Sequence, residues 1–119
     1  GNGSIVNLAS MSGVSAVTSS VPYAVTKAGV IHLTRLAAMQ FAGQGIRVNS
    51  ISPGMIDTAQ SRGVAGSTEE FQRRVSGIPG GCVGQPEDAA NLILFLASDE
   101  ASYISGINCI IDKGRGLMG

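Results

Sequence analysis

A tyrosine and a lysine four residues apart are the first side chains in this sequence whose spacing suggests chemistry. Tyr23 and Lys27 lie in the stretch SSVPYAVTKAG, among small and aliphatic residues. On a helix, residues four apart lie on one face, one turn apart. A cation beside a phenol favours the phenolate and lowers the pKa of a tyrosine, which makes it a better proton carrier near neutral pH. The pair therefore suggests a general acid/base, although the same spacing also occurs where a tyrosine packs and a lysine lies along a helix surface.

Three short apolar runs predict the strands that would position this pair. They cover residues 4–9, 46–52 and 107–112, and each is rich in aliphatic residues. Runs of this kind are typical of strands buried on both faces of a parallel sheet. With helical patterns between them, they predict an open α/β fold with right-handed crossovers.

Two helices are predicted between the strands. Residues 22–41 form the first, with Ser19 or Ser20 as its N-cap and a proline in its first turn. Residues 86–97 form the second, because Pro86 is followed by two acidic residues and then by apolar residues at helical spacing.

The connection at residues 53–85 is long for a compact domain and is typical of a lid or binding loop. Within it, Ser67 and Glu70 predict a capping box that opens a short helix to about Val75. Its glycines and its shortage of apolar bulk predict that residues 58–80 are mobile until the site is filled.

Composition excludes several classes of function. The chain has 119 residues, 44% of them hydrophobic and 13% charged, which indicates a globular protein. Eight basic residues balance eight acidic ones, so we expect neither a nucleic-acid partner nor a membrane partner. Cys82 and Cys109 have neither CxxC nor His-rich surroundings, which argues against a zinc site and a disulfide. With no leader and no apolar run long enough to span a bilayer, we expect a cytoplasmic protein.

Three motifs suggest chemistry that their context does not support. The glycines of GRGLMG, at positions 114, 116 and 119, match a dinucleotide-binding loop, but no helix follows them, so we expect a flexible tail. A serine nucleophile elbow would need glycine where Leu8 stands. His32 lies nine residues after Tyr23 and points away from its face of the helix.

Separate blocks of sequence place the pair in a wider pattern. Ser10 follows the first predicted strand and precedes Tyr23 by thirteen residues, and the blocks RVNSISPGMIDT and GQPEDAANLILFLASDEASYISG follow in order. This pattern resembles the classical short-chain dehydrogenase/reductase family over nearly the whole chain, and only the tail after Asp112 departs from it. The resemblance implies the carboxyl-terminal half of a Rossmann-like doubly wound parallel sheet. Residues 1–119 would be part of one domain, with residues 55–81 as the substrate lid.

The resemblance also implies catalytic roles. Ser10 would hydrogen-bond the oxygen of the substrate, and Tyr23 would pass a proton to or from that oxygen. Lys27 would stabilise the phenolate and bind the nicotinamide ribose hydroxyls. Ser12, two residues closer to the tyrosine, is a decoy.

A nicotinamide cofactor would bind beside these residues. By the resemblance, Pro53 and Gly54 make the turn under the nicotinamide, the backbone of Ile56 meets its carboxamide, and Thr58 contacts the cofactor. No metal is implied. The choice of NAD or NADP stays open, because the residues that make it precede the first strand in this family. The implied function is an NAD(P)-dependent oxidoreductase that interconverts a small-molecule carbonyl and a secondary alcohol, as a homodimer or homotetramer.

The alternative is a catalytically silent fragment or interaction module that uses its two long helices for self-association. In either case the three strands should pair consecutively, with residues 46–52 in the middle. We expect both helices on one face of the sheet, which leaves the other face bare. We also expect residues 4–9 to form an unprotected edge, so that the chain alone aggregates, self-pairs or is unstable.

Overall fold

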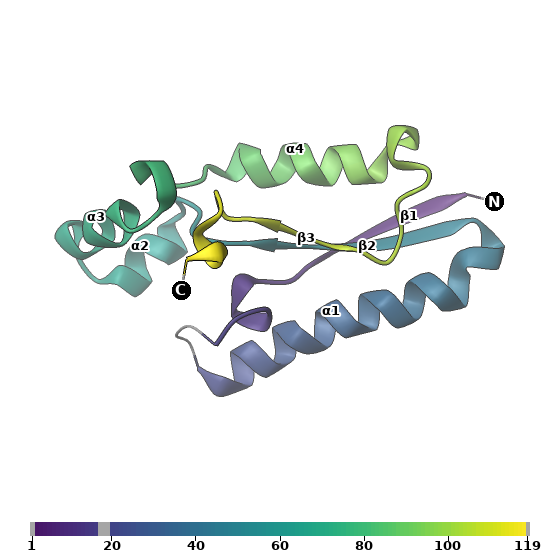
Figure 1. The fold of residues 1–119 in the computed structure, drawn as a ribbon, viewed down its shortest axis with the longest axis horizontal. Coiled ribbons are helices and arrows are strands. Elements are labelled where there is room, and N and C mark those ends of the chain that lie inside the picture. Colours follow the sequence, from purple (N-terminus) through teal and green to yellow (C-terminus); the bar gives the residue numbers. More distant parts are fainter. Residues whose placement is uncertain (1, 17–19, 119) are drawn as a thin grey trace.

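The computed structural model describes residues 2–16 and 20–118 (Figure 1). Ser19 and Gly119, which the sequence assigned to a helix cap and a glycine motif, lie outside these residues. The strands are β1 (Gly3–Leu8), β2 (Ile46–Pro53) and β3 (Asn108–Ile111). The α-helices are α1 (Val21–Phe41), α2 (Ala59–Ala65), α3 (Thr68–Ser76) and α4 (Pro86–Ala97). The 3₁₀ helices are η1 (Met11–Gly13), η2 (Ala42–Gln44), η3 (Pro79–Gly81), η4 (Asp99–Ala101) and η5 (Arg115–Leu117).

The three strands form one parallel sheet in the order β1-β2-β3. β1 pairs with β2 along its whole length, and Leu8 lies opposite Ile51. β3 pairs only with the carboxyl-terminal half of β2, where Asn108 lies opposite Ser50. This confirms the predicted α/β class and the predicted central strand.

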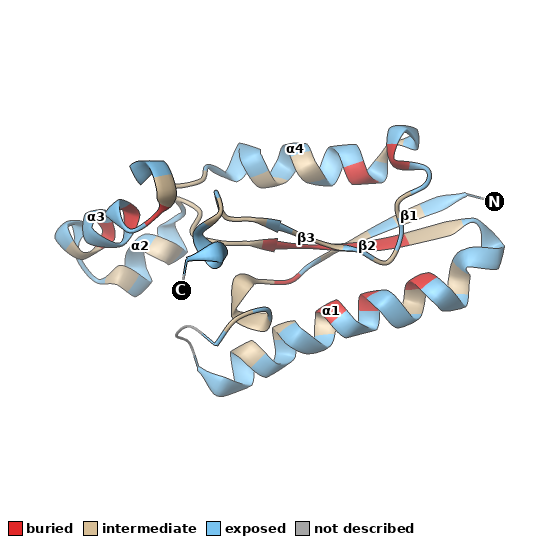
Figure 2. Cartoon of the chain, in the orientation of Figure 1, coloured by how far each residue is buried: buried red, intermediate tan, exposed pale blue. Residues whose placement is uncertain are grey.

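The core is centred on β2. Val48 and Ile51 are 1% and 0% exposed. Figure 2 shows buried residues on β2 and on the sides of α1 and α4 that face the sheet, and a separate group on α3. Three polar residues of β2 are also fully buried: Asn49, Ser50 and Ser52. A buried polar group needs a partner, so these residues constrain what can lie beside them.

β3 and the loop before it supply those partners. The hydroxyls of Ser50 and Ser52 donate to Asn108 Oδ1 over 2.9 and 2.8 Å. The side-chain amide of Asn49 donates to one backbone carbonyl of the preceding loop, and its oxygen accepts from the backbone N–H of Ile107. The polar side chains of the central strand therefore fix the position of its short neighbour.

The two long helices lie on opposite faces of the sheet, and this corrects our expectation that they share one face. On β1, Ser4 Oγ donates to Leu96 O of α4 over 3.2 Å, whereas Asn7 Nδ2 donates to Thr34 Oγ1 of α1 over 3.1 Å. Side chains three apart on a strand point to opposite faces. Figure 1 likewise shows the sheet between α1 and α4.

The two connections therefore have opposite hands, since both carry the chain from one strand to the next in the same direction across the sheet. The right-handed rule assumes a helix that packs back directly after a strand. Before α4, the chain instead passes through α2 and α3, so the twist of β2 does not set the face on which α4 packs. The expected bare face is consequently wrong, because each face carries one helix.

Helix α1 forms where capping and backbone signals agree. Ser20 Oγ accepts from the backbone N–H of Tyr23 over 3.3 Å, and Pro22 occupies the first turn. The helix ends at Phe41, and Gly45 then turns the chain into β2 with a φ of 74°. The predicted start, from Ser20, is confirmed.

The segment predicted to be a lid, taken from here on as residues 57–84, leaves and rejoins the rest of the fold at one point. Asp57 N–H donates to Gly84 O over 2.7 Å, and Gly84 N–H donates to Met55 O over 3.1 Å. A Cβ at Gly84 would lie 2.7 Å from Ile56 Cδ1 and 3.3 Å from Met55 O, so the two segments pack closely at this point. We call this pairing of 55–57 with Gly84 the neck.

The sequence missed helix α2. Thr58 caps it by accepting from Ser61 N–H over 3.1 Å, and Ser61 Oγ accepts in return from Thr58 N–H. Serine at this position is a weaker signal than the glutamate or glutamine of a standard capping box, and Gly63 lowers the helix propensity further.

Helix α3 begins as predicted, with half of the expected capping box. Ser67 Oγ accepts from the backbone N–H of Glu70 over 3.1 Å. The Glu70 carboxylate does not reach back, because it pairs with Arg73 and Arg74. Hydrogen bonds from these two guanidinium groups lower the pKa of Glu70.

The lid has a small core of its own. Phe71, Val75 and Ile78 are 1%, 7% and 8% exposed. The Arg62 guanidinium lies 4.2 Å from the centroid of the Phe71 ring and pairs with Asp57, with Nε 2.7 Å from Oδ1. The hydrogen bond from Arg62 lowers the pKa of Asp57. One arginine thus links the neck, α2 and α3, so we expect the lid to move as a unit.

The described residues that follow β3, up to Met118, are folded, contrary to the expected flexible tail. The Asp112 carboxylate accepts from Gly114 N–H over 2.9 Å and from Gly116 N–H over 2.6 Å. These bonds close a turn that leads into η5.

Arg62→Met should loosen the lid without loosening the sheet. The change removes both the ion pair and the stacking on Phe71, so amides of residues 59–76 should exchange with deuterium severalfold faster. Mass spectrometry of peptides from the lid and from β2 measures the difference. Arg73→Met is the matched control, because Arg73 pairs with Glu70 but stacks on no ring in the described part of the chain. Equal deuterium exchange of the lid amides in wild type and Arg62→Met would show that Arg62 does not hold α2 and α3 together.

The chain expressed alone should self-associate. β1 pairs on one side only, and Ile5 and Leu8 on it are 45% and 57% exposed. Sedimentation velocity should show association that increases with concentration and that Ile5→Lys reduces, because a charge on an edge strand opposes pairing. Gln60→Lys, which adds the same charge on α2, should not reduce it. A monodisperse monomer that unfolds cooperatively would contradict this prediction.

Candidate active site

The ammonium group of Lys27 lies at the carboxyl end of β1. Lys27 Nζ donates to Leu8 O over 3.2 Å, and Leu8 is the last residue of that strand. Ser10 follows two residues later as the N-cap of η1, where its Oγ accepts from Ser12 N–H over 3.1 Å. The structure therefore brings Lys27 to the strand end from which Ser10 projects.

Tyr23 lies one turn before Lys27 on α1, as the spacing predicts. Lys27 Nζ is 5.6 Å from the centroid of the Tyr23 ring, a cation–π contact. Tyr23 is 44% exposed, so its ring is accessible from solvent. The phenol and the ammonium are neighbours on one helix face.

Gly13 holds η1 against α1, and the sequence analysis missed it. A Cβ at Gly13 would lie 2.6 Å from Ala28 N and 2.7 Å from Lys27 C. Only glycine allows the backbone of η1 to approach α1 this closely, beside Lys27. The glycine of the SMSG segment could have suggested a close backbone contact. The sequence does not show which element makes that contact.

The predicted cofactor turn lies at the same edge of the sheet. Pro53 ends β2, and Gly54 N–H donates to Ile111 O over 3.0 Å. A Cβ at Gly54 would lie 2.7 Å from Asp112 Cβ, so the turn and the end of β3 are in close contact. Because the strands are parallel, their carboxyl ends share one edge, where ligands bind in open α/β sheets.

Ile56 and Thr58 lie further along, at the neck of the lid. Ile56 O accepts from Ser61 Oγ over 2.6 Å, and its N–H has no hydrogen-bond partner among the described residues. The Thr58 hydroxyl caps α2. If Thr58 contacts a cofactor as expected, its hydroxyl would have to do so while it also caps α2.

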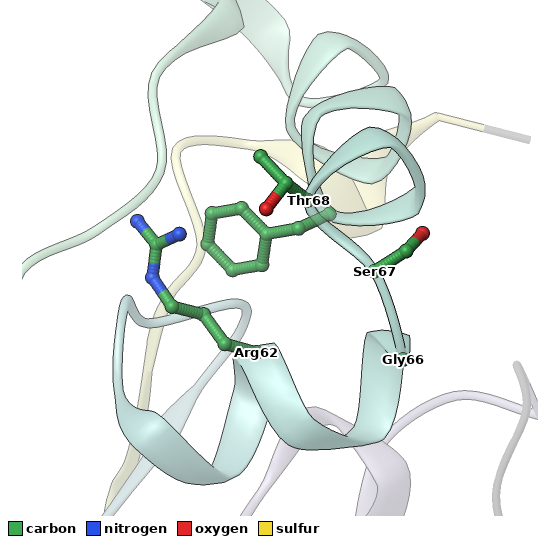
Figure 3. Close-up of a pocket in the computed structure, with 5 residues that line it drawn as sticks. Arg62, Gly66, Ser67 and Thr68 are labelled. Atoms are coloured by element: carbon green, nitrogen blue, oxygen red, sulfur yellow. The ribbon is translucent and has the colours of Figure 1, made fainter.

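A pocket of about 200 Å³ lies between α2 and α3 of the lid (Figure 3). It is lined by Arg62, Gly66, Ser67, Thr68 and Phe71. Figure 3 shows Arg62 on one side of the pocket and Gly66, Ser67 and Thr68 on the turn into α3. The Arg62 guanidinium lies 4.2 Å from the centroid of the Phe71 ring. The pocket contains none of the predicted site residues, so we do not assign it to the site.

The described residues add little support for other kinds of site. No group of three or more His, Cys, Asp or Glu residues among them could hold a metal ion. None of the helices in residues 2–16 and 20–118 is long and apolar enough to cross a membrane. His32 is exposed on α1.

Comparison with known sequences identifies relatives over nearly all of the chain. The family model described as Enoyl-(Acyl carrier protein) reductase matches residues 1–115. A 3-oxoacyl-[acyl-carrier-protein] reductase of Thermotoga maritima is 44% identical over 113 residues, which cover 95% of this chain and 45% of the relative.

Solved structures show the same fold. One described as 4-hydroxyisoleucine dehydrogenase complexed with NADH has a TM-score of 0.90 and 38% identity, over 99% of this chain and 49% of that one. Another, from Beutenbergia cavernae and described as having NADP bound at low occupancy, has a TM-score of 0.90 and 35% identity. The match covers 98% of this chain and 47% of that one.

The chain spans about 45% of the length of the curated relatives it matches. Within that span, the parallel α/β sheet and the sequence match agree. The chain belongs to the classical short-chain dehydrogenase/reductase family.

Proposed function

We propose that this chain is the carboxyl-terminal part of an NAD(P)-dependent oxidoreductase that interconverts a carbonyl and a secondary alcohol. The observation that carries the proposal is the position of Lys27. Its ammonium contacts the Tyr23 ring and is hydrogen-bonded to the end of the strand that precedes Ser10. A proton carrier, a cation and a hydroxyl at the ligand-binding edge of the sheet are the side chains that carbonyl reduction needs.

Ser10 and Tyr23 act on the substrate oxygen in this proposal. Ser10 Oγ already accepts from Ser12 N–H, so its own proton is free to donate to that oxygen. Tyr23 holds the transferred proton on its hydroxyl and gives it to the oxygen during reduction. The bound nicotinamide supplies the hydride.

Lys27 supports both the phenol and the cofactor. An ammonium group has three donors, and Leu8 O accepts one of them. The others are directed, in this proposal, at the ribose hydroxyls of the nicotinamide half. In this proposal its ammonium group, 5.6 Å from the centroid of the Tyr23 ring, is the cation that lies beside the phenol.

The turn after β2 fits a nicotinamide. Gly54 allows close packing at the sheet edge, and the N–H of Ile56, unpartnered within the described residues, is a donor for a carboxamide oxygen. We assign Pro53 to the same turn and Thr58 to a further cofactor contact. Relatives with bound NADH and NADP support a nicotinamide cofactor without choosing between the two.

A second role, in self-association, is favoured by the outer face of α1. Leu33, Leu36 and Met39 are 59%, 56% and 84% exposed there. We propose that this face joins copies of the complete protein as a homodimer or homotetramer. A cytoplasmic location is consistent with the two free cysteines.

Tyr23→Phe in the complete protein should lower kcat for carbonyl reduction by about 100-fold or more, because it removes the proton carrier. Cofactor affinity, measured by calorimetry, should change little. Tyr103→Phe is the matched control, since Tyr103 is fully exposed, and it should keep wild-type kcat. Reduction within about tenfold of wild type in Tyr23→Phe would reject the assigned role.

Lys27→Met should instead weaken cofactor binding, because the ribose hydroxyls lose their cationic donor. Calorimetric titration with NADH and NADPH measures the loss, which we expect to be about tenfold or more. Arg35→Met removes a positive charge from an exposed position two turns further along α1 and should leave the affinity unchanged. Equal affinities in wild type and Lys27→Met would exclude this contact.

A further inference from the structure

Lys113 adopts a backbone conformation that its side chain does not favour. Its φ is 57°, and within residues 2–16 and 20–118 it is the only residue other than glycine with a positive φ. Glycine or asparagine makes such a turn at lower cost. Turn geometry therefore does not explain the lysine.

The position of Lys113 is fixed from both sides. Asp112, the residue before it, packs against Gly54 and accepts hydrogen bonds from the N–H groups of Gly114 and Gly116. The turn cannot shift without losing these bonds. Lys113 is therefore held beside the turn that we assign to the nicotinamide.

The segment around Lys113 touches two further parts of the site. A Cβ built on Gly80 of the lid would lie 3.7 Å from Lys113 Cε, so the lysine side chain extends to the lid. A Cβ built on Gly116 would lie 2.8 Å from Met11 Cε, and Met11 directly follows Ser10. The carboxyl-terminal turn thus joins η1, the end of β2 and the lid.

Lys113 is exposed, and its ammonium group has no acidic partner among the described residues. The lid carboxylates of Asp57 and Glu70 pair with arginines, and the Asp112 carboxylate accepts from two backbone amides. A cation without a counter-ion, between a lid and the ligand-binding edge of a sheet, is suited to an anionic ligand.

We propose that Lys113 is a substrate-binding residue that selects carbonyl substrates carrying an anionic group, a carboxylate or a phosphonate, at a distance from the reacting carbon. The inference rests on the proposed function. It places the anionic end of the substrate between the lid and the turn at Lys113, with the carbonyl towards Ser10 and Tyr23.

The test uses the complete protein and a series of oxo carboxylates and oxo phosphonates of increasing chain length, each paired with its neutral methyl ester. Wild type should prefer the anionic member in at least one series. Lys113→Asn, which removes the charge and tolerates a positive φ, should reduce that preference in kcat/KM by about tenfold or more, chiefly through KM. Lys113→Arg should retain much of it. Comparable thermal unfolding of the variants excludes misfolding as the cause.

Arg115→Gln is the matched control, because Arg115 is an exposed cation on the same turn. An equal loss of preference in Arg115→Gln would show that the preference comes from the overall positive charge of this turn and not from a contact with Lys113. That result would overturn the proposal. So would the absence of any preference in wild type, or a fall in cofactor affinity in Lys113→Asn, which would place a cofactor phosphate at this lysine. If wild type reduces no carbonyl with either cofactor, the proposed function fails first, and calorimetric binding of the anionic compounds to wild type and Lys113→Asn then decides the role of Lys113.

Discussion

The buried polar side chains in the centre of β2 must all form hydrogen bonds, and the positions of the other elements depend on this requirement. Ser50 and Ser52 share the oxygen of Asn108, and Asn49 bonds the loop before β3. A buried polar group without a partner costs about 1–3 kcal/mol. A shift of β3 by one residue would turn Asn108 to the other face and leave the serines unpaired. The register that results brings Asp112 against the turn at the end of β2 and so shapes the edge of the sheet.

The sheet edge is shaped by the close approach of backbones as well as by the side chains that we propose as catalytic. Gly13 brings η1 against α1 next to Lys27, and Gly54 brings the end of β2 against β3. A methyl group at either glycine would meet backbone or Cβ atoms within 3 Å, so neither contact can relax by rotating a side chain. Ser10 and Tyr23 come from different elements, and their relative position depends on this packing.

The sequence was sufficient to predict features that depend on residues close together in the chain. Ser20 and Pro22 predict the start of α1, and the spacing of Tyr23 and Lys27 predicts their shared face. The sequence was not sufficient for features that depend on contacts between elements far apart in the chain. The face on which α4 packs depends on the course of the lid, and the contact at Gly13 depends on how η1 meets a helix. Helix α2 was missed because its cap uses Ser61, a weak signal in sequence.

The neck also bears on how such a scaffold can acquire new specificities. The lid begins and ends at neighbouring positions, Asp57 and Gly84, which are joined by backbone hydrogen bonds that do not depend on side-chain identity. The entropy of closing a loop grows only slowly with its length. A segment of another length or sequence can therefore be grafted between these two residues while β2, α4 and the sheet edge keep their places. If this segment faces the substrate as we propose, recombination at this junction would exchange one substrate-facing surface for another in a single step.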